Sequence, residues 1–560
     1  MIGVIASAAD YPVVSEFFEL FKTPWEFYRS DRQYDVLLCA GNDSVDENAA
    51  KLVLIYAGRE HPSDAKEKIE IASRRSNLIL SHMGARIPIY GDSVTFRRAN
   101  AGVPVDEESR QPVVQLNHGG TVVRIGYDLF AEVRILLTVG QPAVNASMPA
   151  LDLHIALLRE LIVASGASLT EIPPIPDGYK FIACLTHDVD HPAIRSHKFD
   201  HTVLGFLYRA TFGSLRDFLR GRIPVRNLLT NWAAALKLPF VYLGLAKDFW
   251  CDFADRYREL EEGLGSTFFI IPFKAYPGKN RRGQAPGFRA ARYGARDVAN
   301  TIRKITAAGS EIGLHGIDAW LDGSSARKEL EEIRRLTGSS EIGVRMHWLY
   351  YDQQSPLALE QAEAAYDSTI GYNETVGYRA GTLQAYKPFE AVRLLELPLH
   401  VMDTALFYPN YLGLSSRQAM TRVSQLIDNA VQLGGCLTMN WHDRSVAPER
   451  LWDACYRDLV QELRSRDAWF ATAGQAAAWF RKRRSVVFET DWMEAEAVRA
   501  KLPVDAIGDL PGLRVRTHNA RETCRTGVRS LERYFDVAVE GSFDDRPLAV
   551  HSLPTLSKVL

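Results

Sequence analysis

Short apolar runs that end in polar residues recur along the chain, and each one predicts a buried strand that delivers its last residues to a site. The polar residues at these ends are Asp188 and Asp190, His315, Arg379, and His442. In a (β/α) barrel, the C-terminal ends of the strands are where the chemistry is assembled. Two carboxylates at i and i+2 are costly if they are buried without partners, so a metal ion or an arginine is expected beside the aspartates.

Helical patterns follow these strands. The stretch Asp248–Leu264 has apolar residues at helical spacing, and further helices are expected over 295–308, 325–336, 418–433 and 449–464. Nearer the start, strand-like runs are expected at 34–39, 52–56 and 121–125, with helices at 14–21 and 151–165. They predict a small α/β domain. His118-Gly119-Gly120 indicates a hairpin turn within it.

These patterns divide the chain into three segments. Residues 1–172 form the N-terminal α/β domain, whose role is open, and the proline-rich stretch Ile172–Gly178 marks its end. Residues 173–484 hold the polar strand ends and a helical insertion at about 195–260. Residues 485–560 are expected to form a small β-rich appendage with structural or glycan-positioning duties.

Composition limits the classes of function. The chain has 46% hydrophobic and 24% charged residues, which is typical of a soluble globular protein, and its net charge of −2 gives no general attraction to nucleic acid. No apolar stretch is long enough to span a bilayer. No signal peptide is evident, because acidic residues interrupt the first twenty positions. The six cysteines are scattered and contain no C-x-x-C pair, so we expect free thiols and a cytoplasmic protein.

The motifs resemble the polysaccharide deacetylase family over roughly residues 175–480. The matching segments are Thr186–Asp190, Glu311–Gly316, Gly377–Gly381 and Trp441–Asp443. This family has the NodB-homology fold, a distorted (β/α) barrel, and removes acetyl groups from N-acetylated sugars with a divalent metal. The resemblance implies the following roles: Asp188 as catalytic base, Asp190 and His315 as metal ligands, Arg379 as the arginine that orients the base, His442 as catalytic acid, and Asp403 as the residue that orients His442.

The sequence departs from the family pattern in its metal site. Ala319 stands where the second metal histidine is expected, four residues after His315. His347 ends another short apolar stretch one β-α unit later, and Asp318 is the competing replacement ligand. We favour His347, because an Asp/His/His set suits zinc. Two smaller departures are Val189 between the aspartates and Ala380 where proline usually follows the arginine.

Other polar and aromatic residues near the motifs have less definite roles. Four histidines cluster around the first motif and are expected to orient ligands or to lie on the surface: His187, His191, His197 and His201. Trp348 and Trp441 could line a sugar groove and are equally good core residues.

The first part of the insertion, residues 195–226, is basic and interleaved with aromatic side chains. Such a stretch can lie on an anionic membrane surface or bind a phosphate-bearing lipid. The alternative is a helical lid with a solvated basic face.

The leading interpretation is a metal-dependent hydrolase that deacetylates an N-acetylated sugar of a surface polysaccharide or a lipid-linked glycan precursor. Its partners would then be a glycan or glycolipid substrate, with peripheral membrane contact. Two alternatives stay open: hydrolysis of a non-sugar amide on the same barrel, and a catalytically inactive glycan-binding protein that lost its metal at Ala319. The sugar, the linkage and the oligomeric state are not given by the sequence.

Overall fold

The structure is a computed structural model that describes residues 1–41, 50–97, 102–116, 121–198, 200–490, 498–501, 509–518 and 534–538. Seven strands from the middle of the chain pair in parallel. They are β11 (Phe181–Val189), β12 (Ser266–Ile270), β15 (Glu311–Gly316), β16 (Val344–Met346), β17 (Val401–Met402), β18 (Cys436–Asn440) and β19 (Ala468–Phe470). Their order is β16-β15-β12-β11-β18-β17, and β19 also pairs with β11.

The sheet curves towards a ring. Parallel bridges from Val344 to Asp367 and from Asp367 to Glu396 continue it from β16 to the segment that leads into β17. This is the distorted (β/α) barrel expected from the sequence. All nine residues of β11 are buried, as in strands covered on both faces.

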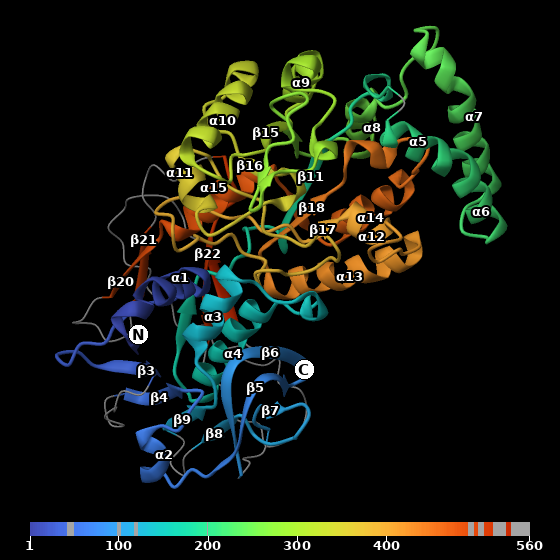
Figure 1. Cartoon of the computed structure of the whole chain (residues 1–560). Coiled ribbons are helices and arrows are strands. Elements are labelled where there is room, and N and C mark those ends of the chain that lie inside the picture. Colours follow the sequence, from blue (N-terminus) through green and yellow to red (C-terminus); the bar gives the residue numbers. More distant parts are fainter. Residues whose placement is uncertain are drawn as a thin grey trace, which may run out of the picture.

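Helices cover the outside of the barrel (Figure 1). They include α9 (Ala299–Ala307), α10 (Gly323–Thr337), α13 (Ser416–Leu433), α14 (Asp453–Ser465) and α15 (Ala473–Arg484). The expected helices at 295–308, 325–336, 418–433 and 449–464 correspond to α9, α10, α13 and α14. The one expected over 248–264 is shorter, α8 (Phe253–Leu260), because both ends of that stretch form turns.

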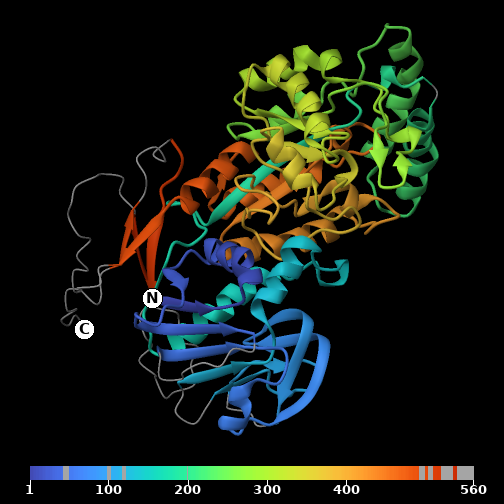
Figure 2. The ribbon, with the colours of Figure 1, turned by 60° about the vertical axis from the view of Figure 1, so that its left-hand side comes forward.

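The N-terminal region contains a six-stranded sheet in the order β2-β1-β3-β4-β9-β8 (Figure 2). Its strands are β1 (Ile2–Ile5), β2 (Trp25–Phe27), β3 (Tyr34–Ala40), β4 (Ala50–Tyr56), β8 (Val114–Leu116) and β9 (Val122–Ile125). Helices α1 (Tyr11–Phe21), α3 (Leu129–Thr138) and α4 (Ala150–Ala164) share its core.

A second, three-stranded sheet in this region was not expected from the sequence. It pairs β5 (Ile71–His82) with both β6 (Ala85–Phe96) and β7 (Val105–Asp106). Polar residues such as Arg74 and Arg75 interrupt β5, so the apolar pattern of a buried strand is absent. The predicted turn at His118–Gly120 lies outside the described residues.

The C-terminal residues that the structure describes are short antiparallel strands. β20 (Val487–Thr490) pairs with β21 (Val498–Lys501), and β22 (Arg514–His518) pairs with β23 (Tyr534–Ala538). β22 also pairs with β10 (Leu169–Glu171), the strand that precedes the proline-rich stretch. In this sheet the C-terminal segment therefore pairs with the last strand of the N-terminal region.

The proline-rich stretch is buried from Ile172 to Pro176 and is not an exposed tether. Arg483, at the end of α15, is 1% exposed and fixes it in place. Its guanidinium donates to the Ile172 carbonyl from Nε and Nη2, at 2.9 and 2.6 Å, and to the Leu20 carbonyl at 2.9 Å. It also donates to the carbonyl of Glu19 and to Gln384 Oε1, at 3.2 and 3.1 Å. One side chain thus links the N-terminal region to the barrel.

A helical insertion separates β11 from β12 and projects from one edge of the barrel (Figure 1). It contains α5 (His201–Tyr208), a π-helical turn at Arg209–Gly213, α6 (Ser214–Leu219) and α7 (Val225–Tyr242). Among the described helices, none is both long and apolar enough to cross a bilayer.

Replacing Arg483 tests the link between the two regions. Arg483→Met should lower the free energy of unfolding by about 2–4 kcal/mol, because it leaves several buried carbonyls without donors. Urea denaturation followed by circular dichroism measures the change. Arg417→Met, at an exposed arginine of α13, is the matched control and should change it by less than about 0.5 kcal/mol. Equal effects of the two substitutions would contradict this role of Arg483.

Candidate metal centre

Three predicted metal ligands converge at the C-terminal ends of the barrel strands. Asp190 follows β11, His315 lies in β15, and His347 follows the neighbouring strand β16. His315 Nε2 and His347 Nδ1 are 3.1 Å apart, and each lies 3.4 Å from Asp190 Oδ1. Two ligand atoms bound at about 2.05 Å to a tetrahedral zinc ion would lie about 3.3 Å apart. The three atoms therefore have nearly the spacing of one face of a zinc tetrahedron.

The protonation of Asp190 and His347 also suits a cation. Asp190 Oδ1 is buried and accepts no hydrogen bond within the described residues. Burial opposes its charge, but His347 and His315 hold the pKa of the Asp190 carboxyl well below its ordinary value. Burial lowers the pKa of His347, which favours the neutral imidazole that binds metals. A carboxylate oxygen without a donor, facing two imidazole nitrogens, is the donor set expected for a divalent metal.

Neighbouring groups fix both histidines. His315 Nδ1 lies 3.0 Å from the carbonyl of Arg345, which leaves Nε2 as the nitrogen that faces the cluster. The buried Arg289 donates to the His347 carbonyl at 2.8 Å and to that of Ile317 at 3.1 Å. After His347 the chain turns sharply, because Trp348 has a φ of 65° in the left-handed region. Such strain outside glycine is concentrated at functional sites.

Asp188 lies beside this cluster and is paired with an arginine, but the arginine is Arg345. Arg345 Nη1 lies 3.2 Å from Asp188 Oδ1, and both side chains are buried. Asn440 holds the second oxygen, since its Nδ2 donates to Asp188 Oδ2 at 2.7 Å. Arg345 also donates to Thr186 Oγ1 at 2.6 Å and to both oxygens of Ser368, at 2.9 Å (carbonyl) and 2.8 Å (hydroxyl).

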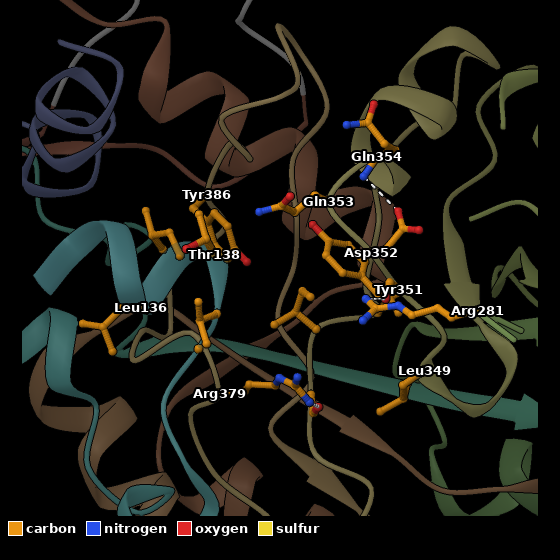
Figure 3. Close-up of a pocket in the computed structure, with 16 residues that line it drawn as sticks. Leu136, Thr138, Arg281, Leu349, Tyr351, Asp352, Gln353, Gln354, Arg379 and Tyr386 are labelled. Carbon is orange, nitrogen blue, oxygen red and sulfur yellow. Dashed lines mark hydrogen bonds between the residues drawn. The ribbon is translucent and has the colours of Figure 1, made fainter. Parts of the chain in front are cut away.

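The prediction that Arg379 orients Asp188 is wrong. Arg379 donates to the Gly371 carbonyl at 3.0 Å and lines a cavity of about 610 Å³ between α3 and loops of the barrel (Figure 3). Its segment forms no strand, because it is hydrogen-bonded to the N-terminal region: Tyr378 N–H donates to the Ala146 carbonyl and Gln141 N–H to the Arg379 carbonyl, each at 2.8 Å.

A signal for Arg345 was present in the sequence. Side chains of a strand alternate between its faces, so Arg345 and His347 are expected on the same side at i and i+2. The same spacing relates Asp188 to Asp190. The resemblance of Gly377–Gly381 to a family motif drew the assignment to Arg379 instead.

The competing ligand Asp318 lies outside the cluster. Its Oδ2 accepts a hydrogen bond from Tyr276 at 2.5 Å, and its Oδ1 accepts one from the Lys279 backbone at 2.8 Å. Both of its oxygens therefore hold the loop before β13 (Lys279–Asn280). Within the described residues, the group able to hold a metal is Asp190, His315 and His347.

His442 faces the cluster from the loop after β18 and is fixed by Asp403. Its Nδ1 lies 2.6 Å from Asp403 Oδ1, and its backbone N–H donates to Asp403 Oδ2 at 2.7 Å. Its Nε2 points towards Asp190, 3.8 Å from Oδ2. Burial opposes protonation, but Asp403, Asp190 and Asp188 together raise the pKa of His442 to about 10. His442 therefore carries a proton at neutral pH in this arrangement.

The four histidines around the first motif lie outside the group of metal ligands. His187 is buried against Tyr257, with Nε2 at 2.8 Å from Glu261. His191 Nδ1 lies 3.2 Å from His197 Nε2, and His197 Nδ1 lies 2.9 Å from Asp200. His201 is exposed at the start of α5.

The two tryptophans differ in position. Trp441 is 1% exposed and belongs to the core, so it does not line a groove. Trp348 is half-buried beside His347, with the exposed Phe288 ring 5.4 Å from its own.

No family model matches the chain, and no curated protein matches it in sequence. Among solved structures, it is similar to a protein of Mycobacterium smegmatis assigned as a polysaccharide deacetylase, with 19% identity, 56% of this chain and 95% of that chain covered, and a TM-score of 0.33. Puue allantoinase shares 14% sequence identity with a TM-score of 0.33. The match covers 55% of this chain and 92% of that chain. A family 4 acetyl xylan esterase of Clostridium thermocellum, in complex with cobalt, shares 15% sequence identity with a TM-score of 0.24. The match covers 53% of this chain and 89% of that chain.

Substitution of the two arginines separates their roles. Arg345→Met should lower turnover by at least about 10²-fold, because it leaves the buried carboxylate of Asp188 without its ion-pair partner. Arg379→Met should leave turnover within about threefold of the unchanged protein. Thermal unfolding of each variant controls for loss of fold, and Arg345→Lys should recover part of the activity if charge is what matters. A larger loss in Arg379→Met than in Arg345→Met would restore the original assignment.

Metal titration tests the ligand set. In calorimetric titrations with Zn²⁺, the unchanged protein should bind one ion, and Asp190→Asn or His347→Ala should weaken binding by about 100-fold or more. Asp318→Asn and Asp188→Asn should keep nearly full affinity, because neither side chain belongs to the cluster. Equal weakening by Asp318→Asn and His347→Ala would contradict this set.

Proposed function

We propose that the protein is a metal-dependent N-deacetylase of the polysaccharide deacetylase family, acting on an N-acetylated sugar. One observation carries the proposal: a candidate metal site, a carboxylate paired with an arginine, and a histidine paired with a carboxylate lie together at one end of the barrel. These groups provide the parts that amide hydrolysis requires, namely an electrophile, a base and an acid. The resemblance of the motifs to the family supplies the substrate class.

A divalent metal bound by Asp190, His315 and His347, most simply zinc, would polarise a carbonyl oxygen and lower the pKa of a water. Asp188, paired with Arg345 and held in its orientation by Asn440, would take the proton from the attacking water. The proton on His442 Nε2 would pass to the leaving nitrogen. Asp403 keeps that nitrogen turned to the site and stabilises the imidazolium.

The arrangement favours an enzyme over the glycan-binding alternative. Ala319 stands in place of the expected second metal histidine. A protein that only binds glycans would not need another metal ligand in its place. His347 nevertheless occupies a position within reach of His315 and Asp190. The backbone turn at Trp348 and the buried donor Arg289 hold the His347 imidazole in place as a replacement for the second metal histidine.

We propose a cytoplasmic location and a glycan or glycolipid substrate. Within the described residues, Cys184, Cys251, Cys436 and Cys455 have free thiols. Cys184 and Cys436 are buried on neighbouring strands. Close, unpaired thiols suit a reducing compartment.

Removing the acid tests both the role of His442 and the reaction. With short oligomers of N-acetylglucosamine and the Zn²⁺-loaded protein, His442→Ala should lower acetate release by about 10²–10⁴-fold, because amine departure requires a proton. Hydrolysis of 4-nitrophenyl acetate should suffer far less, since its leaving group departs without one. Equal loss on both substrates would show that His442 is not the leaving-group acid.

Acetate release itself decides the reaction class. If the metal-loaded protein releases no acetate from N-acetylated sugars or glycolipids, deacetylation is wrong and the glycan-binding interpretation takes its place. Asp188→Asn serves as the inactive control, because it should keep metal and lose turnover.

A further inference from the structure

The insertion carries an unusual share of the exposed apolar surface. Residues 201–245, here called the insertion hairpin, hold thirteen of the twenty-six large hydrophobic side chains that are exposed among the described residues. Five of the thirteen are more than 70% exposed: Phe212, Leu219, Leu236, Leu243 and Leu245. Soluble proteins rarely expose so many apolar groups in one short region unless a partner covers them.

Helix α7 has two apolar faces. One face, with Ala234, Leu238 and Val241, is buried in a cluster with Phe206 and Trp250. The other is an exposed stripe that consists of Val225, Leu229, Trp232, Leu236, Phe240 and Leu243. At 100° per residue, these six positions fall within an arc of about 80°. An apolar stripe that follows the helix so closely is typical of a surface that a partner covers.

The first half of the hairpin repeats the pattern. From α5 through the π-helical turn to α6, the exposed apolar residues follow helical spacing, at Leu204, Tyr208, Phe212, Leu215 and Leu219. α6 packs against α7, so the two stripes belong to one paired unit. The hairpin stands at the outer edge of the molecule (Figures 1 and 2).

The charge of the hairpin is strongly positive. Between residues 204 and 245 the chain has six basic residues and one acidic residue, Asp217. The basic residues are Arg209, Arg216, Arg220, Arg222, Arg226 and Lys237. At 100° per residue, Arg226 and Lys237 lie about 40–60° beyond the edge of the α7 stripe. Apolar residues flanked by lysine and arginine are the pattern of helices that lie in the surface of an anionic bilayer.

We propose that the insertion hairpin docks the protein onto the surface of an anionic lipid membrane, with the exposed stripes among the lipid chains and the basic residues at the headgroups. The charge favours this partner over a second copy of the chain. A twofold dimer through the hairpin would set the same positive surface against itself, which costs energy. A negative lipid surface complements both the charge and the apolar stripes.

The start of the hairpin lies near the metal centre. The exposed Phe288 contacts the ring of His201, at the start of α5, and that of Trp348, the neighbour of His347. Asp200, which caps α5, pairs with His197 and with Arg292 at 2.9 and 3.3 Å. Docking would therefore bring the site close to the bilayer. If the proposed deacetylase function holds, this places a glycan carried on a lipid as its substrate.

The test is flotation of the full-length protein with vesicles of phosphatidylcholine, with and without phosphatidylglycerol. Binding should require phosphatidylglycerol and weaken with salt. The combined variant Leu229→Gln, Leu236→Gln and Phe240→Gln should bind at least about tenfold less. The control, Met83→Gln, Val144→Gln and Val392→Gln, changes three apolar residues elsewhere that are even more exposed, and it should bind normally.

Zn²⁺ binding separates this proposal from the proposed function, because neither triple variant changes a residue of the metal centre. Both should bind Zn²⁺ with unchanged affinity, and retained membrane binding by an inactive protein would leave docking intact. Vesicle binding that survives the hairpin variant overturns the proposal. A second result would also overturn it: the unchanged protein does not bind anionic vesicles but forms a dimer in analytical ultracentrifugation, and the hairpin variant is a monomer. The hairpin would then be an interface between two copies of the chain.

Discussion

The pairing of buried Arg345 with Asp188 is the interaction on which the site and the barrel both depend. A carboxylate this deeply buried is stable only with a compensating cation and full hydrogen bonding. Arg345 supplies the charge from β16, while its other donors bind Thr186 in β11 and Ser368 in the segment that continues the ring. The same guanidinium therefore balances the charge of the proposed base and ties together three parts of the barrel wall.

This dependence explains which site residues could be predicted from the sequence. Asp190, His315 and His347 each end a strand, and parallel strands carry their ends to the same edge, so local patterns were enough to expect their convergence. The partner of Asp188 depends on which strand lies across the ring. That is a long-range property, because 157 residues separate the two. Arg379 matched a motif, but its segment is bound to the N-terminal region and forms no strand.

The same distinction holds for the rest of the fold. The helices α10 and α13 were expected at nearly their observed positions, because apolar spacing and end signals agree there. In α10, Asp322 accepts hydrogen bonds from Ser324 and Ser325, and Gly338 ends the helix with a φ of 73°. The β5–β6 ladder was missed because the polar residues Ser73–Asn77 interrupt the apolar pattern of β5. The two apolar faces of α7 could not be distinguished by sequence, since only the packing shows which one the core uses.

The contact between Gly377 and Ala146 has a consequence for the cavity beside Arg379. Gly377 has a φ of 140°, and a Cβ placed there would lie 2.0 Å from the Ala146 carbonyl oxygen. The two backbones touch here without intervening side chains, and the hydrogen bond from Tyr378 N–H to the Ala146 carbonyl holds them together. The walls of the 610 Å³ cavity are in place before anything enters it. A molecule that bound there would be selected by its shape. Its binding free energy would not be reduced by the cost of closing the two regions around it.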